Sequence, residues 1–164
     1  MPEILFVCTA NQFRSPIAAA CFRRRLEQAG LADTWQVSSA GTWAYEGLPA
    51  HPRAVAEAAR YGLDLEYHLT REVSSPILEG ASLIVVMENN HREAITIEFP
   101  QVSHKVALLA ELAGDLPIDV ADPARSFFTD SAEITSLLCQ YTDAAFENIL
   151  TRAASSNTGT GSQT

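Results

Sequence analysis

The feature that most constrains the fold is a short apolar run near the N-terminus that passes through a polar loop into a helix. The apolar character of residues 3–8 predicts a buried strand. Residues 16–29 are predicted to be helical, with Ser15 as the cap, Pro16 at the first helical position and Gly30 after the end. A strand that leads directly into a helix is the repeating unit of parallel α/β sheets. The sequence therefore favours an α/β fold.

Strand and helix patterns continue to alternate along the chain. Further strands are predicted at 35–39, 82–87 and 105–109, and further helices at 53–61, 88–99 and 131–152. We therefore predict a single α/β domain over residues 1–152, with a four-stranded parallel sheet flanked by helices on both faces. Residues 153–164 are mostly small and polar, which predicts a disordered tail.

Composition excludes several classes of protein. The net charge of −9, from 11 basic and 20 acidic residues, argues against a nucleic-acid partner. No run of 18 apolar residues is present, so no membrane partner is expected, and the N-terminus lacks the basic region of a signal peptide, which predicts a cytoplasmic protein. The chain has three cysteines, none in CxxC spacing, so no disulfide framework is predicted. Its four histidines are scattered, so no metal site is predicted either. No cofactor is expected.

The loop between the first strand and the first helix carries the candidate chemistry. Loops at the carboxyl ends of parallel strands, beside a helix N-terminus, are natural anion sites. Cys8 ends the strand and Arg14 follows six residues later, so the backbone amides between them can surround a phosphate while Arg14 binds two of its oxygens. The predicted phosphate-binding residues are Thr9, Ala10, Asn11, Gln12, Phe13, Arg14 and Ser15.

The same surroundings favour the thiolate form of Cys8, which is the nucleophilic form. Ser15 can donate its hydroxyl to Cys8, and Asn11 tolerates the left-handed backbone of a tight loop. The alternative is that Cys8 is a small buried apolar residue and Arg14 a surface residue. Their position between a strand and a helix favours a cysteine-dependent phosphatase with Cys8 as nucleophile.

The chain resembles the low-molecular-weight protein tyrosine phosphatases. The resemblance rests on Val7-Cys8-Thr9-Ala10-Asn11-Gln12-Phe13-Arg14-Ser15-Pro16, Ser39-Ala40-Gly41-Thr42, Pro52-Arg53-Ala54, His68-Leu69-Thr70-Arg71 and Asp122-Pro123. These landmarks follow the family's order and approximate spacing over residues 3–152. The resemblance implies metal-independent hydrolysis of phosphate monoesters through a phosphocysteine, with a phosphorylated protein, above all one carrying phosphotyrosine, as the substrate.

The resemblance also implies roles for residues outside the loop. Asp122 takes the place of the general acid, whereas an Asp-Pro pair alone would indicate only a turn; Asp119 is the one nearby competitor. Ser39 and His68 match positions that hydrogen-bond to the asparagine and serine of the phosphate loop.

The sequence departs from the family pattern at three places. Ala10 replaces a loop glycine, so we expect an allowed negative φ or some strain there. Phe13 replaces a second cysteine, which in relatives forms a protective disulfide. Ala124 and Arg125 replace aromatic residues that usually follow Asp-Pro. The predicted substrate wall then consists of Gln12, Phe13, Tyr45 and Ala124.

Other functions stay open at this stage. A branch of the family that hydrolyses phosphoarginine has a threonine where Gln12 stands, so the polar Gln12 keeps this substrate open. A thiol-linked arsenate reductase would share the fold; Cys21 and Cys139 do not match the positions of its additional cysteines, which leaves open a reductase that draws on an external thiol. A non-catalytic phosphate-binding module is disfavoured by the joint presence of Cys8, Arg14 and Asp122.

Overall fold

The sheet has four parallel strands. The structure, a computed structural model, describes residues 1–123 and 130–158, with side chains as far as Ser156. Strands β1 (Glu3–Cys8), β2 (Gln36–Gly41), β3 (Leu83–Val86) and β4 (Val106–Leu108) pair in the order β2-β1-β3-β4. The predicted four-stranded parallel sheet is confirmed.

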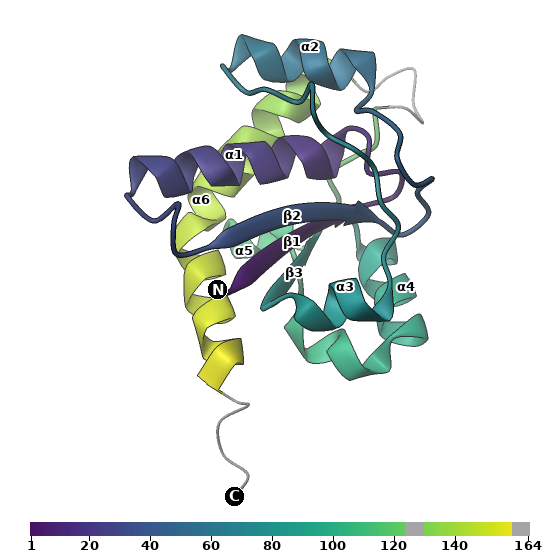
Figure 1. The fold of residues 1–164 in the computed structure, drawn as a ribbon, viewed down its shortest axis with the longest axis vertical. Coiled ribbons are helices and arrows are strands. Elements are labelled where there is room, and N and C mark those ends of the chain that lie inside the picture. The colour runs from purple at the N-terminus through teal and green to yellow at the C-terminus, as the bar shows by residue number, and fades with distance from the viewer. Residues whose placement is uncertain (124–129, 159–164) are drawn as a thin grey trace, which may run out of the picture.

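Helices cover both faces of this sheet (Figure 1). They are α1 (Arg14–Gln28), α2 (Pro52–Arg60), α3 (Ser75–Gly80), α4 (Asn89–Glu98), the 3₁₀ helix η1 (Pro100–Lys105), α5 (Leu109–Leu112) and α6 (Ser131–Thr158). Sequence periodicity missed α3, η1 and α5, because helices of only four to six residues show too little of a repeat to be recognised.

Two apolar cores lie on opposite faces of the sheet because the side chains of β1 alternate. Ile4 and Phe6 join a core formed with α1, α2, α5 and α6. Leu5 and Val7 join a second core with α3, α4 and η1. Every residue of β1 from Ile4 to Cys8 is buried, as expected for a strand covered on both faces.

The strand order reverses at β1, and this reversal positions the site. The chain leaves β1 through α1 and returns as β2 on one side, whereas β3 pairs with β1 on the other side. In open α/β sheets, ligands bind at the carboxyl ends of the strands where the order reverses. That point is occupied by Cys8 and the loop that follows it.

Helix α1 begins earlier than predicted. It starts at Arg14, with Phe13 as the residue before it and no side-chain cap. Pro16 therefore lies within the first turn, where its missing N–H group would have had no partner inside the helix. Ser15 is not a helix cap, and its side chain is free to serve the loop instead.

Helix α6 extends further than predicted. It continues to Thr158, six residues past the expected boundary at residue 152, and the buried Ala153 packs in the core with α1. The predicted tail therefore begins inside this helix, and residues 159–164 lie outside the described part of the chain. No helix among the described residues is long and apolar enough to cross a membrane.

Candidate active site

Cys8 lies at the floor of the loop, at the end of β1. Its side chain is buried, and its Sγ lies 3.0 Å from Ser15 Oγ. Because Ser15 belongs to the first turn of α1, this contact joins the end of the strand to the start of the helix. A serine hydroxyl that donates to sulfur favours the thiolate form of a cysteine.

Asn11 holds the loop in its curled form. It is the one described residue other than glycine with a positive φ, at 58°, and asparagine tolerates this left-handed conformation better than most residues. Its Nδ2 donates to Ser15 Oγ (2.8 Å) and Ser39 Oγ (2.9 Å), and its Oδ1 accepts from the backbone N–H of Arg71 (3.0 Å). Three separate segments are thus fixed to the centre of the loop.

His68 completes this support from below the loop. Its Nε2 lies 2.7 Å from the carbonyl oxygen of Asn11, and since a carbonyl only accepts, the ring nitrogen donates. Burial lowers the pKa of His68 and outweighs the hydrogen bond to Asn11, which raises it, while the nearby Arg23 lowers the pKa further. The neutral ring with its proton on Nε2 is therefore the form that the folded protein favours.

Gly41 allows β2 to pass directly under the loop. A Cβ atom at this position would lie 2.3 Å from the carbonyl oxygen of Thr9 and 3.0 Å from the backbone nitrogen of Asn11. The close approach lets Thr42 N–H donate to the carbonyl of Cys8 (2.9 Å). Only glycine fits here without displacing the phosphate loop.

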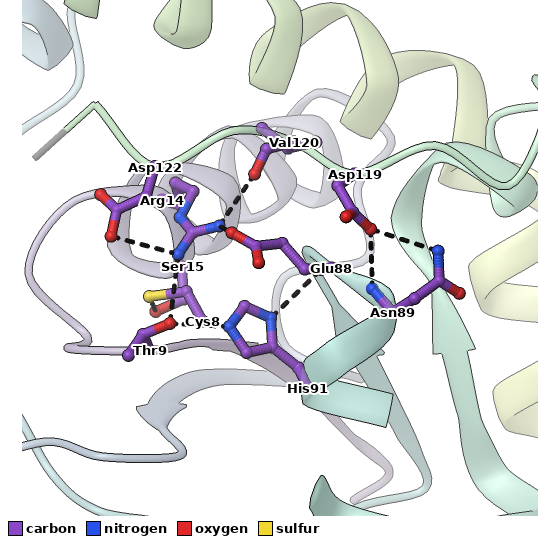
Figure 2. A network of polar contacts seen from close by, with 10 residues as sticks. All are labelled: Cys8, Thr9, Arg14, Ser15, Glu88, Asn89, His91, Asp119, Val120 and Asp122. Carbon is purple, nitrogen blue, oxygen red and sulfur yellow. Dashed lines mark hydrogen bonds and ion pairs between the residues drawn. The ribbon is translucent and has the colours of Figure 1, made fainter. Parts of the chain in front are cut away.

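Arg14 is almost completely buried and is oriented by several partners (Figure 2). Its Nη1 donates to Glu88 and to the carbonyl oxygen of Val120 (2.8 Å), and its Nη2 lies 3.3 Å from Thr9 Oγ1. A buried guanidinium needs such compensation, and the ion pair with Glu88 provides it. The result is a fixed cationic group beside Cys8.

Glu88 and His91 form part of the site although they were absent from the prediction. His91 Nδ1 accepts from the backbone N–H of Glu88 (3.1 Å), so in the neutral ring the proton lies on Nε2, which donates to Thr9 Oγ1 at 2.9 Å. The signal for Glu88 was present, because it directly follows the strand pattern that ends at Met87. The position of His91 depends on how α4 packs, which the sequence pattern does not reveal.

The two candidate acids lie in different surroundings (Figure 2). Asp122 Oδ2 is 3.5 Å from Arg14 Nη2, and Asp122 lines the same pocket as Cys8. Asp119 instead accepts from the backbone N–H and the side-chain amide of Asn89, at 2.7 and 3.2 Å, at the start of α4. Asp122 is thus the carboxylate that faces the thiol, whereas Asp119 is occupied by a structural contact.

A pocket opens over the loop. Its lining residues are Cys8, Ala10, Gln12, Phe13, Arg14, His51, Arg53 and Asp122. Gln12 is oriented by a hydrogen bond from its Nε2 to the carbonyl oxygen of Pro49 (3.3 Å), and Ala10 has no positive φ, so its replacement of glycine causes no left-handed strain. His51 and Arg53, at the start of α2, were not predicted to line this pocket.

Tyr45, a further residue of the predicted wall, does not line this pocket. Tyr45 is 78% exposed and is not among the pocket's lining residues, because the loop after β2 directs its side chain to the surface. Ala124 and Arg125 lie outside the described residues. Of the predicted wall, the structure thus brings Gln12 and Phe13 to the pocket.

The protein has an α/β fold. Cys8 and Arg14 lie at the turn between the first strand and the first helix, which is where folds of this kind bind anions. The family model for the low molecular weight phosphotyrosine protein phosphatases matches residues 3–155. The chain belongs to this family.

Two curated relatives illustrate its range. A probable low molecular weight protein-tyrosine-phosphatase, EpsP, from Ralstonia nicotianae is 33% identical over 141 residues, which cover 86% of this chain and 91% of the relative. A protein-arginine-phosphatase from Bacillus subtilis is 34% identical over 121 residues, which cover 74% of this chain and 79% of the relative.

Solved structures agree with the fold. The crystal structure of a low molecular weight protein tyrosine phosphatase from T. tengcongensis superimposes with a TM-score of 0.82 at 30% identity. The match covers 90% of this chain and 99% of that one.

Proposed function

We propose that this protein hydrolyses phosphotyrosine in proteins without a metal ion, through a phosphocysteine on Cys8. The observation that carries the proposal is the grouping of Cys8, Arg14 and Asp122 in one pocket above the loop. Family membership supports the same reaction class.

In the first step, the Cys8 thiolate attacks phosphorus, and a P–S bond forms as the ester P–O bond breaks. Asp122 gives its proton to the departing phenolate oxygen. The loop amides and Arg14 bind the three non-bridging oxygens, where negative charge is spread in the transition state.

In the second step, Asp122 takes a proton from a water molecule that attacks the phosphocysteine. The P–S bond breaks, phosphate leaves, and Cys8 returns to its thiolate form. Ser15, at 3.0 Å from the sulfur, stabilises that leaving thiolate with its hydroxyl.

A panel of peptides with one sequence and different phosphorylated residues tests the substrate assignment. We expect turnover of phosphotyrosine to exceed that of phosphoserine, because the pocket combines the aromatic Phe13 with a deep position for the thiol. Equal turnover of the two would contradict the assignment to phosphotyrosine while leaving the phosphocysteine chemistry intact.

Phosphoarginine is the second candidate substrate. The Bacillus subtilis relative carries the name of a protein-arginine-phosphatase, and the polar Gln12 lies at the pocket wall with its amide held by Pro49. A phosphoarginine peptide in the same panel distinguishes the two substrates. A preference for it of about tenfold or more, equivalent to 1.4 kcal/mol, would assign the protein to that branch.

Arsenate reduction receives less support. The described residues that line the pocket around Cys8 include no second cysteine, so a reductase on this site would have to draw on an external thiol. The cytoplasmic location stays a prediction from the sequence.

A further inference from the structure

Two cysteines that the proposed reaction does not use lie against each other where α1 meets α6. Cys21 on α1 and Cys139 on α6 both line a hollow of about 300 Å³. This hollow shares no lining residue with the pocket around Cys8. None of the three cysteines forms a disulfide in the structure.

The two helices present matched turns to this hollow. Each contributes residues at helical spacing: Cys21, Arg24, Arg25 and Gln28 from α1, and Ser136, Cys139, Gln140 and Asp143 from α6. One turn beyond the cysteines, Arg25 Nε and Asp143 Oδ1 form an ion pair at 2.5 Å, and the Arg25 guanidinium lies 4.6 Å from the centre of the Phe146 ring. The register of α1 against α6 is therefore fixed next to the two thiols.

The two thiols differ in exposure and in acidity. Cys21 is buried, whereas Cys139 is partly exposed. The hydrogen bond between the two thiols raises the pKa of Cys21 far above its ordinary range, and burial raises it further. The same hydrogen bond lowers the pKa of Cys139 and outweighs the opposite effect of burial, and the charge of Arg24 also lowers this pKa. Cys139 is thus the more acidic and the more accessible of the two thiols.

We propose that Cys21 and Cys139 form a redox-active dithiol, which hydroperoxides oxidise to a disulfide that links α1 to α6. The Cys139 thiolate attacks a peroxide oxygen, the O–O bond breaks, and Cys139 becomes a sulfenic acid as one water is released after protonation. The Cys21 sulfur then attacks the Cys139 sulfur, the S–O bond breaks, and a second water leaves. Two thiols lose two electrons, and one hydrogen peroxide is reduced to two waters.

The disulfide would act on the helix that carries the phosphate loop at its start. Helix α1 begins at Arg14, and Cys21 lies two turns further along it. A covalent link to α6 closes a long loop of chain, so the oxidised protein is expected to unfold at a higher temperature than the reduced protein.

The test uses the full-length Cys8→Ser variant, which removes the thiol of the phosphate loop and leaves the pair. We expect hydrogen peroxide to consume both remaining thiols with a mass loss of about 2 Da. Peptide mapping without reduction should yield a Cys21–Cys139 linked peptide, and the thermal midpoint should rise until dithiothreitol is added. If both thiols stay free, or if the disulfide joins two molecules, the proposal is wrong.

Two further variants assign the roles. In Cys8→Ser/Cys21→Ala, the Cys139 sulfenic acid should accumulate and react with dimedone, because the resolving thiol is gone. In Cys8→Ser/Cys139→Ser, Cys21 should stay reduced and the midpoint should not move with peroxide. Cys139 is partly exposed, so its replacement by serine is expected to leave the fold intact. The Cys139→Ser variant therefore still tests the proposal if replacement of the buried Cys21 impairs folding. Dimedone labelling of Cys21 instead of Cys139 would overturn the assignment.

Discussion

At the scale of single residues, the site depends on side chains that hold other groups in position. Asn11 connects the phosphate loop to Ser15, Ser39 and the backbone of Arg71, while Glu88 compensates the buried charge of Arg14. The loop and Arg14 are thus held in position by other groups of the protein, which is how a site avoids the cost of reorganisation.

The assignment of the general acid is tested by Asp122→Asn. The variant cannot protonate a leaving oxygen, so it should slow esters with poor leaving groups by roughly 10²–10⁴, and para-nitrophenyl phosphate far less. Steady-state rates on alkyl and aryl phosphates give the comparison. Asp119→Asn is the matched control, since Asp119 binds Asn89 and not Arg14. If Asp119→Asn showed the dependence on leaving group and Asp122→Asn did not, the acid would be misassigned.

His68 is expected to make stability depend on pH. Burial lowers its pKa below the ordinary value of 6.5, so below that pH the unfolded chain binds a proton that the folded protein resists. This contribution is fully present above about pH 6.5 and is lost as the pH falls toward the lowered pKa.

The measurement is denaturant unfolding between about pH 7 and pH 5, for the wild type and for His68→Gln. The variant should lose less free energy of unfolding over this interval than the wild type. His104→Gln, at an exposed position in η1, is the control and should follow the wild type. An unchanged pH dependence in His68→Gln would show that the ring is not the group responsible.

At the scale of secondary-structure elements, the site is formed where β1, β2 and α1 meet. Cys8 pairs with Gly41 across the two strands, and α1 begins six residues after Cys8. This arrangement could be predicted in large part from sequence, because the apolar run, the polar loop and Pro16 are local signals. The start of α1 at Arg14 could not be predicted in this way. A serine directly before Pro16 is typical of a helix cap, and only its contacts with Cys8 and Asn11 show that its side chain serves the loop instead.

Gly41→Ala tests how closely β2 must approach the loop. The added methyl would overlap the carbonyl oxygen of Thr9, which is backbone and cannot move without shifting the loop. We expect a loss of stability of about 1–3 kcal/mol and a fall in kcat/KM. Gly80→Ala, where a methyl meets nothing within 4 Å, is the control and should be close to neutral in both respects. Full activity in Gly41→Ala would contradict the close approach.

At the scale of the whole molecule, the charge of the protein opposes its substrate. The chain carries a net charge of −9, so a phosphate dianion is attracted by the local loop and not by the overall field. Within this site the buried Arg14 is paired with Glu88 and Asp122, whereas Arg53 is exposed at the pocket.

Peptide charge should therefore change the efficiency of turnover. At low ionic strength we expect phosphotyrosine peptides with basic flanks to show higher kcat/KM than peptides with acidic flanks, and added salt should bring the two together because it screens exposed charges. Salt titrations of matched peptides measure this. A preference for acidic flanks at low salt would show that a local basic surface dominates over the net charge.

Less could be predicted from the sequence about the packing of the whole molecule than about its single residues and its secondary-structure elements. The family, the sheet and the group of Cys8, Arg14 and Asp122 followed from ordered landmarks along the chain. Contacts between distant segments could not be predicted, because no local sequence pattern shows how α4 and α6 pack against the rest of the protein. His91 reaches Thr9 from α4, and Cys139 meets Cys21 across α6 and α1, although each appeared in the sequence as an isolated residue. Tyr45 was expected near the pocket, and its loop instead leaves it exposed.

The central claim is that turnover proceeds through a phosphoryl group on Cys8. The most direct measurement is an acid quench of the enzyme during turnover of para-nitrophenyl phosphate, followed by mass spectrometry of the peptide that contains Cys8. We predict a phosphorylated Cys8 in the wild type, and no turnover in Cys8→Ser although that variant still binds inorganic phosphate through the loop and Arg14. Substantial turnover by Cys8→Ser, or a phosphoryl group trapped on a different residue, would contradict the account.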